Sequence, residues 1–188
     1  MSQQELLRTV VQALESIGAD YMVTGSLVSS LQGMPRSSHD IDVVVAMREE
    51  HIDALMRAFP PPEFYLEEIA IRQAIEHESM FNLLSATEGD KVDFWVLTDS
   101  PFDQSRFSRR HSEDVFDISI KVSSPEDTIL AKLRWAEQSG GSEKQFTDAL
   151  RVFEVQYETL DISYLEEWAG RLGVGGLLDR LRAEAETP

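Results

Sequence analysis

The strongest constraint on the fold of this chain is a short stretch in which two aspartates stand inside a run of β-branched residues. Residues 40–45 read Asp-Ile-Asp-Val-Val-Val. On a β-strand, successive side chains point to opposite faces, so Asp40 and Asp42 share one face and Ile41, Val43 and Val45 take the other. Two neighbouring carboxylates repel each other, and their oxygens are suitable ligands for a divalent metal ion. The stretch therefore predicts a strand with one apolar face and one face that binds a cation.

A Gly-Ser turn precedes this strand. Residues 21–26 read Tyr-Met-Val-Thr-Gly-Ser, which predicts a short strand and then a helix that begins at Gly25 and Ser26. Backbone N–H groups and a hydroxyl at a helix N-terminus suit a phosphate. Alone, such a turn is more often a helix cap than a phosphate loop. Next to the two aspartates, it indicates a site for a metal-bound nucleotide.

A third carboxylate stands within another apolar strand. Asp93 lies between Val92 and Phe94, so it faces away from the apolar side of a strand expected over residues 91–97. If this strand pairs beside the strand that carries Asp40, all three carboxylates meet on one surface. Three converging acids can hold two metal ions about 3.5–4 Å apart, an arrangement that supports in-line phosphoryl displacement.

Hydrophobic periodicity outlines the remainder of the chain. It predicts helices over residues 2–18, 26–32, 48–59, 67–77 and 101–111, and strands over residues 21–24, 40–46, 80–85, 91–97 and 115–122. Alternation in the last strand places Phe116 on its core face. From Ser123 onward the period is helical, and Ser124 is expected to cap the first of these helices. We therefore predict an α/β (α+β) fold: a small mixed β-sheet flanked by helices in residues 1–123, and a C-terminal helical region in residues 124–188.

The amino-acid composition restricts the classes of function that the chain is expected to have. The 188 residues carry a formal net charge of −17, which disfavours extended contacts with DNA or RNA. No apolar run approaches the roughly 20 residues that a membrane helix needs. The chain has no cysteine, and its first residues lack the basic and apolar segments of a signal peptide. These features predict a cytoplasmic protein that does not bind a membrane.

The order of these motifs resembles a known family. An apolar-Gly-Ser turn, an Asp-apolar-Asp strand and a later strand aspartate are typical of the nucleotidyltransferase superfamily of the DNA polymerase β type. The chain is most similar to the small bacterial branch that includes toxin components of abortive-infection and toxin–antitoxin systems. Residues 125–135 and 144–148 also resemble that branch. The resemblance implies the nucleotidyltransferase fold.

The resemblance implies a catalytic role for the three aspartates. Asp40 and Asp42 would bind two Mg²⁺ ions. Asp93 would complete the second metal site and orient or deprotonate the attacking hydroxyl. A nucleoside triphosphate would be the donor substrate.

The resemblance also implies a second group of residues, which binds the triphosphate. Gly25 and Ser26 would touch its β- and γ-phosphates, and Lys132 is a further candidate contact. Asp148 is a candidate structural partner of Lys132. Arg36 and Ser38, in the loop before Asp40, would add phosphate or substrate contacts. A surface lysine that extends along an apolar helix face is the alternative for Lys132.

The expected function is Mg²⁺-dependent transfer of a nucleoside monophosphate to a hydroxyl group of a tRNA, a protein or a small molecule, in a toxin-type component. One alternative is a non-catalytic nucleotide- or metal-binding partner, such as an antitoxin-like protein of the same fold. Another is a structural protein whose acidic cleft binds only metal.

Overall fold

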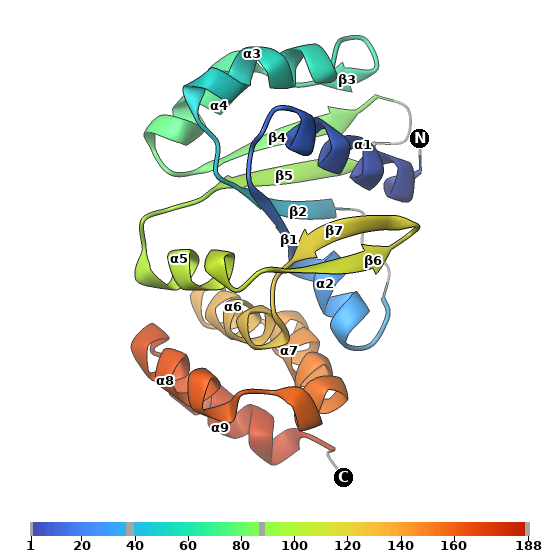
Figure 1. The fold of residues 1–188 in the computed structure, drawn as a ribbon. Coiled ribbons are helices and arrows are strands. Elements are labelled where there is room, and N and C mark those ends of the chain that lie inside the picture. Colours follow the sequence, from blue (N-terminus) through green and yellow to red (C-terminus); the bar gives the residue numbers. More distant parts are fainter. Residues whose placement is uncertain (1, 37–39, 87–88, 187–188) are drawn as a thin grey trace. The chain divides into compact units, whose positions relative to one another are not determined.

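The computed structural model describes residues 2–36, 40–86 and 89–186 (Figure 1). Contacts within the chain divide it into two compact units. The first comprises Met1–Thr24 and Ser38–Val122, and the second comprises Gly25–Ser37 and Ser123–Pro188. The expected division into residues 1–123 and 124–188 stays a prediction. Helix α2 (Gly25–Gln32) precedes that boundary in the sequence but belongs to the second unit.

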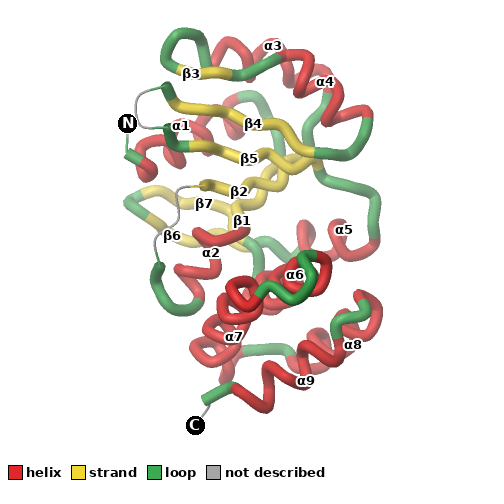
Figure 2. Tube along the Cα trace, turned by 180° about the vertical axis from the view of Figure 1, so that it is seen from behind, coloured by secondary structure: helices red, strands yellow, loops and turns green. Residues whose placement is uncertain are grey.

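The first unit is built on a mixed β-sheet. Its helices are α1 (Gln3–Ser16), α3 (Glu49–Ala58), α4 (Glu68–Glu76) and α5 (Pro101–Ser108). Its strands are β1 (Tyr21–Thr24), β2 (Asp40–Val45), β3 (Phe64–Tyr65), β4 (Met80–Ser85), β5 (Lys91–Val96), β6 (His111–Val115) and β7 (Ile118–Val122). Within the described residues, the sheet has seven strands in the order β3-β4-β5-β2-β1-β7-β6, drawn in yellow in Figure 2. The predicted mixed sheet flanked by helices is confirmed.

The centre of the sheet is the parallel pair β2 and β5. β-Branched and aromatic residues favour a pleated, packed surface, and the apolar face of this pair is fully buried. Phe94 stacks on Phe81 of β4, with ring centroids 4.9 Å apart. Ile41, Val43 and Val92 are completely inaccessible to solvent. This face fixes which side chains of the two strands point the other way.

The structure differs from the prediction after α5. The single strand expected over residues 115–122 is a hairpin of β6 and β7, and β6 begins where the preceding helix was expected to end. Phe116 and Asp117 turn the chain with φ angles of 51° and 61°, the left-handed backbone that a two-residue hairpin loop requires. Phe116 is therefore 39% exposed and does not lie in the core. The two-residue strand β3 was also not predicted.

The second unit is helical. It contains α2 (Gly25–Gln32), α6 (Pro125–Gln138), α7 (Glu143–Gln156), the 3-10 turn η1 (Tyr157–Thr159), α8 (Ile162–Leu172) and α9 (Gly175–Glu184). As predicted, Ser124 caps α6: its hydroxyl accepts the N–H of Asp127 at 3.2 Å. The fully buried Asp127 carboxylate also accepts the hydroxyl of Tyr164 at 2.7 Å, which ties α6 to α8. Among the helices that the structure describes, none is long and apolar enough to cross a membrane.

Helix α2 packs against α7 with a close backbone approach. A Cβ atom added to Gly33, directly after α2, would lie 2.9 Å from the backbone nitrogen of Val152 and 3.0 Å from the carbonyl carbon of Arg151. The Gln156 side chain donates to the Gln32 carbonyl at 2.9 Å beside this contact. Glycine is therefore required here for space, and the contact fixes the start of the loop that carries Arg36.

Replacing Gly33 should destabilise the second unit. Because the neighbouring atoms are backbone, Gly33→Ala should lower the free energy of unfolding by about 1–3 kcal/mol, the usual cost of overpacking, measured by urea denaturation. The matched control is Gly170→Ala within α8, where nothing lies within 4 Å of an added Cβ; it should be neutral or stabilise by up to about 1 kcal/mol. Equal effects of both changes would contradict the steric account.

Candidate active site

Four charged side chains form a two-by-two arrangement on the face of β2 and β5 that points away from the buried apolar side. The register places Asp42 opposite Asp93 and Asp40 opposite Lys91. Residues two apart on a strand share a face, so all four belong to one surface, named here the acidic patch (Asp40, Asp42, Lys91 and Asp93). The predicted meeting of the three carboxylates on one face is confirmed.

The carboxylates of the acidic patch differ in exposure. The Asp40 side chain is 55% exposed, whereas that of Asp93 is only 11% exposed. The indole N–H of Trp95 donates to Asp42 Oδ1 at 3.4 Å. Beyond Trp95 the same face is closed by an apolar cluster of Met22, Val44 and Phe107. The patch thus lies at the N-terminal ends of the two strands, beside a dry apolar region.

Asp93 carries an unusual oxygen. Its Oδ1 atom is buried and has no hydrogen-bond partner among the residues that the structure describes. A buried polar atom without a partner costs free energy, and an ordered water, an ion or a ligand would supply the missing partner. The neighbour of Asp93 on β4 is Asn82, which is exposed.

Lys91 is the residue of this patch that the sequence analysis missed. Its Nζ atom lies 2.9 Å from Asp93 Oδ2 and 3.8 Å from Asp40 Oδ1. The hydrogen bond to Asp93 raises the pKa of Lys91, so its ammonium group is charged at neutral pH. The available signal was its position two residues before Asp93, on the same strand face.

The patch can serve a divalent cation, although not through all three acids at once. Across residues 2–36, 40–86 and 89–186, no group of three or more acidic or histidine side chains is arranged to hold a metal ion. The ammonium group of Lys91 lies among these carboxylates, in contact with Asp93 and within 4 Å of Asp40. Asp42 and Asp93, which face each other directly, offer hard oxygen donors, and the orphaned Oδ1 of Asp93 fits such an ion.

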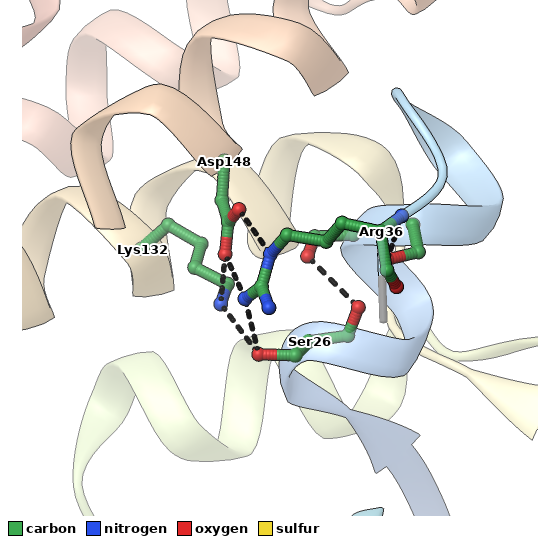
Figure 3. A network of polar contacts seen from close by, with 6 residues as sticks. Ser26, Arg36, Lys132 and Asp148 are labelled. Carbon is green, nitrogen blue, oxygen red and sulfur yellow. Dashed lines mark hydrogen bonds and ion pairs between the residues drawn. The ribbon is translucent and has the colours of Figure 1, made fainter. Parts of the chain in front are cut away.

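A second polar group lies in the helical unit and centres on a serine hydroxyl (Figure 3). Arg36 binds Asp148 through two hydrogen bonds, of 2.8 and 2.7 Å, and its Nη2 also donates to Ser26 Oγ at 2.7 Å. Lys132 Nζ donates to Asp148 Oδ2 at 2.8 Å and lies 3.5 Å from Ser26 Oγ. We name these four residues the Ser26 network (Ser26, Arg36, Lys132 and Asp148).

The network is largely shielded from water. The side chains of Lys132 and Asp148 are 6% and 8% exposed, and that of Arg36 is 28% exposed. Burial alone would raise the pKa of Asp148, but the hydrogen bonds and charges of Arg36 and Lys132 outweigh it and lower that pKa. The hydrogen bond to Asp148 raises the pKa of Arg36. Arg36 and Lys132 are both cations, and charge-assisted hydrogen bonds from such groups suit an anion.

The structure thus assembles most of the predicted site residues within these two groups. Gly25 begins α2 with a φ angle of 72°, a conformation that favours glycine. The burial of Lys132 rules out the surface-lysine alternative, and its expected contact with Asp148 is present. Ser38 lies outside the described residues. The catalytic and nucleotide-binding roles of all these residues stay predictions.

Comparison with known proteins supports the fold. Searches with family models and among curated protein sequences return no match. Solved structures do match: ANT(2")-Ia in complex with adenylyl-2"-tobramycin has a TM-score of 0.61 and 12% identity, over 92% of this chain and 98% of that chain. The lincosamide antibiotic adenylyltransferase LnuA, lincomycin-bound, has a TM-score of 0.55 and 13% identity, over 82% of this chain and 98% of that chain.

An antigenic nucleotidyltransferase-like protein from Paracoccidioides brasiliensis matches with a TM-score of 0.52 and 16% identity, over 97% of this chain and 93% of that chain. At these identities the likeness is one of fold. The chain therefore has the nucleotidyltransferase fold that its motifs predicted.

Proposed function

We propose that this protein is a nucleotidyltransferase that moves a nucleoside monophosphate from a nucleoside triphosphate to a hydroxyl group of a small molecule. The observation that carries the proposal is the register pair Asp42 and Asp93, with the buried and orphaned Oδ1 of Asp93. A buried carboxylate that served only the fold would have both of its oxygens hydrogen-bonded. The pair instead suits a ligand that supplies positive charge.

In this proposal, the acidic patch binds the part of the nucleoside triphosphate that reacts, the α-phosphate. Asp42 and Asp93, with Asp40 beside them, would hold Mg²⁺, which stabilises negative charge on a phosphate in reaction. Asp93 would accept the proton of the acceptor hydroxyl group while the oxygen of that hydroxyl group bonds to the α-phosphorus. The bond between the α-phosphorus and the bridging oxygen breaks, and pyrophosphate leaves.

In this proposal, the Ser26 network binds phosphate groups of the triphosphate. Arg36 presents a planar guanidinium, which matches phosphate oxygens, and Lys132 supplies a buried point charge. Asp148 holds both cations in place by direct hydrogen bonds. Gly25 and Ser26 would add backbone N–H groups from the first turn of α2. The role of Ser38 stays a prediction.

The acceptor is proposed to be a small cationic molecule. The net charge of −17 attracts cations and repels the phosphates of RNA. Two proteins of this fold are described with antibiotics, one with an adenylyl-tobramycin and one with lincomycin. Tobramycin, lincomycin and bulk tRNA are therefore the acceptors to test first. The toxin-type role suggested by the resemblance stays a prediction.

The test is transfer of a labelled α-phosphate. The full chain is incubated with Mg²⁺, each α-labelled nucleoside triphosphate and each acceptor, and the products are separated. We expect label on a small-molecule acceptor and equimolar release of pyrophosphate. Label on tRNA or protein would overturn the proposed acceptor, and no label on any acceptor, including a cell extract, would favour the non-catalytic partner.

Asp42→Asn should abolish transfer without unfolding the protein. The amide keeps the shape but removes a metal-binding charge, so the rate should fall about 100-fold or more, as measured by label transfer. Stability should be unchanged or higher, because one like-charge repulsion is lost. The matched control is Asp114→Asn, an exposed aspartate on β6. Full activity in Asp42→Asn would refute the assignment.

Lys132→Met should weaken triphosphate binding. A charge-assisted contact contributes roughly 1.5–3 kcal/mol, so the dissociation constant measured by calorimetry should rise at least about tenfold. Lys144→Met, an exposed lysine on α7, should bind as the wild type does. If Lys132→Met is folded and binds normally, Lys132 serves only to hold Asp148.

Asp148→Asn should destabilise the protein in a pH-dependent way. Because the folded-state pKa of Asp148 is lowered, its charge stabilises the fold above the unfolded pKa of about 3.9, and this stabilisation is lost as pH falls through the folded pKa. The variant should lose roughly 1–3 kcal/mol at pH 7 and approach the wild type in acid. Asp179→Asn, exposed on α9, should change little at either pH.

A further inference from the structure

The acidic patch already contains one cation. Lys91 stands directly opposite Asp40 in the pairing of β2 with β5. Its ammonium nitrogen lies 2.9 Å from Asp93 Oδ2 and 3.8 Å from Asp40 Oδ1. Both the lysine and its partners are anchored on central strands, so the strand pairing itself holds this positive charge among the carboxylates.

The two oxygens of Asp93 have different partners. Oδ2 accepts the hydrogen bond from Lys91, whereas Oδ1 has no partner among the described residues. Asp93 is nevertheless buried, since the residue as a whole is 7% exposed. One oxygen is therefore satisfied by the resident ammonium group. The other is buried, desolvated and left for a further donor or cation.

The charges of the patch match one divalent ion. Asp40, Asp42 and Asp93 carry three negative charges when ionised, and Lys91 compensates one of them. Summed over these four side chains alone, the charge is −2, which one divalent cation would balance. A second divalent ion would meet an ammonium group that is only partly exposed, at 30%, and is therefore weakly screened by water and salt.

We propose that Lys91 takes the place of one of the two divalent cations, so that the acidic patch alone binds a single divalent metal ion. This inference rests on the proposed function, because it takes the patch to be the metal site of a nucleotidyltransferase. It replaces the expected two-ion site with one ion and one tethered ammonium group. A second ion would have to bring its own oxygen ligands, as the phosphates of a nucleotide do.

The test measures how many Mn²⁺ ions the protein binds and does not depend on catalytic activity. The full chain, without nucleotide, is titrated with Mn²⁺ and followed both by calorimetry and by the electron paramagnetic resonance signal of free Mn²⁺. The wild type should bind one ion. Lys91→Met should bind that ion about tenfold more tightly, because a nearby positive charge is gone, and should take up a second ion.

Two further variants are controls. One keeps the positive charge at position 91, and the other removes a lysine elsewhere on the sheet. Lys91→Arg keeps the positive charge and should keep the single ion. Lys121→Met removes a lysine of the same sheet that pairs instead with the exposed Asp20 at 3.4 Å, and it should bind Mn²⁺ as the wild type does. Circular dichroism should show every variant folded.

The outcomes separate this inference from the proposed function. Two ions in the wild type, or unchanged number and affinity in Lys91→Met, would overturn the role of Lys91 and leave the nucleotidyltransferase proposal standing. If no variant binds Mn²⁺, the inference fails, and the labelled-phosphate assay decides separately whether transfer occurs.

Discussion

The parallel pairing of β2 with β5 is the interaction on which the candidate site depends. Its register is held by the apolar face, where Ile41, Val43 and Phe94 are fully buried. A slip of one residue would turn the side chains of one strand to the opposite face. It would bury a carboxylate in the core and expose an aromatic ring. The burial that stabilises the sheet is therefore also what sets Asp42 opposite Asp93.

Each unit contains a cluster of charged side chains in which one sign is more frequent. The acidic patch has three carboxylates and one ammonium group, and the Ser26 network has two cations and one carboxylate. Considered each by itself, the acidic patch suits a cation and the Ser26 network suits an anion.

The strands that carry the aspartates were predictable because they depend only on the alternation of apolar and polar residues along the sequence. The alternation in residues 40–45 and around Asp93 gave both strands and the face of each carboxylate. The β6–β7 hairpin was missed because Phe116 and Asp117 form a two-residue turn without glycine or asparagine, and the alternation of apolar residues continues through it. The burial of Lys132 depends on Asp148 and on Arg36, which is distant in sequence, and no helical pattern contains that information.

The Ser26 network argues against a protein that binds only metal. A metal site needs oxygen donors, and the acidic patch supplies them without Arg36 or Lys132. Holding both cations against one carboxylate, with Lys132 almost fully buried, costs desolvation free energy that a metal ion cannot recover. Ser26 receives a hydrogen bond from Arg36 and lies 3.5 Å from Lys132 Nζ, so both cations lie close to the first turn of α2, where backbone N–H groups also favour an anion. The network therefore favours an anionic ligand, as the proposed function requires.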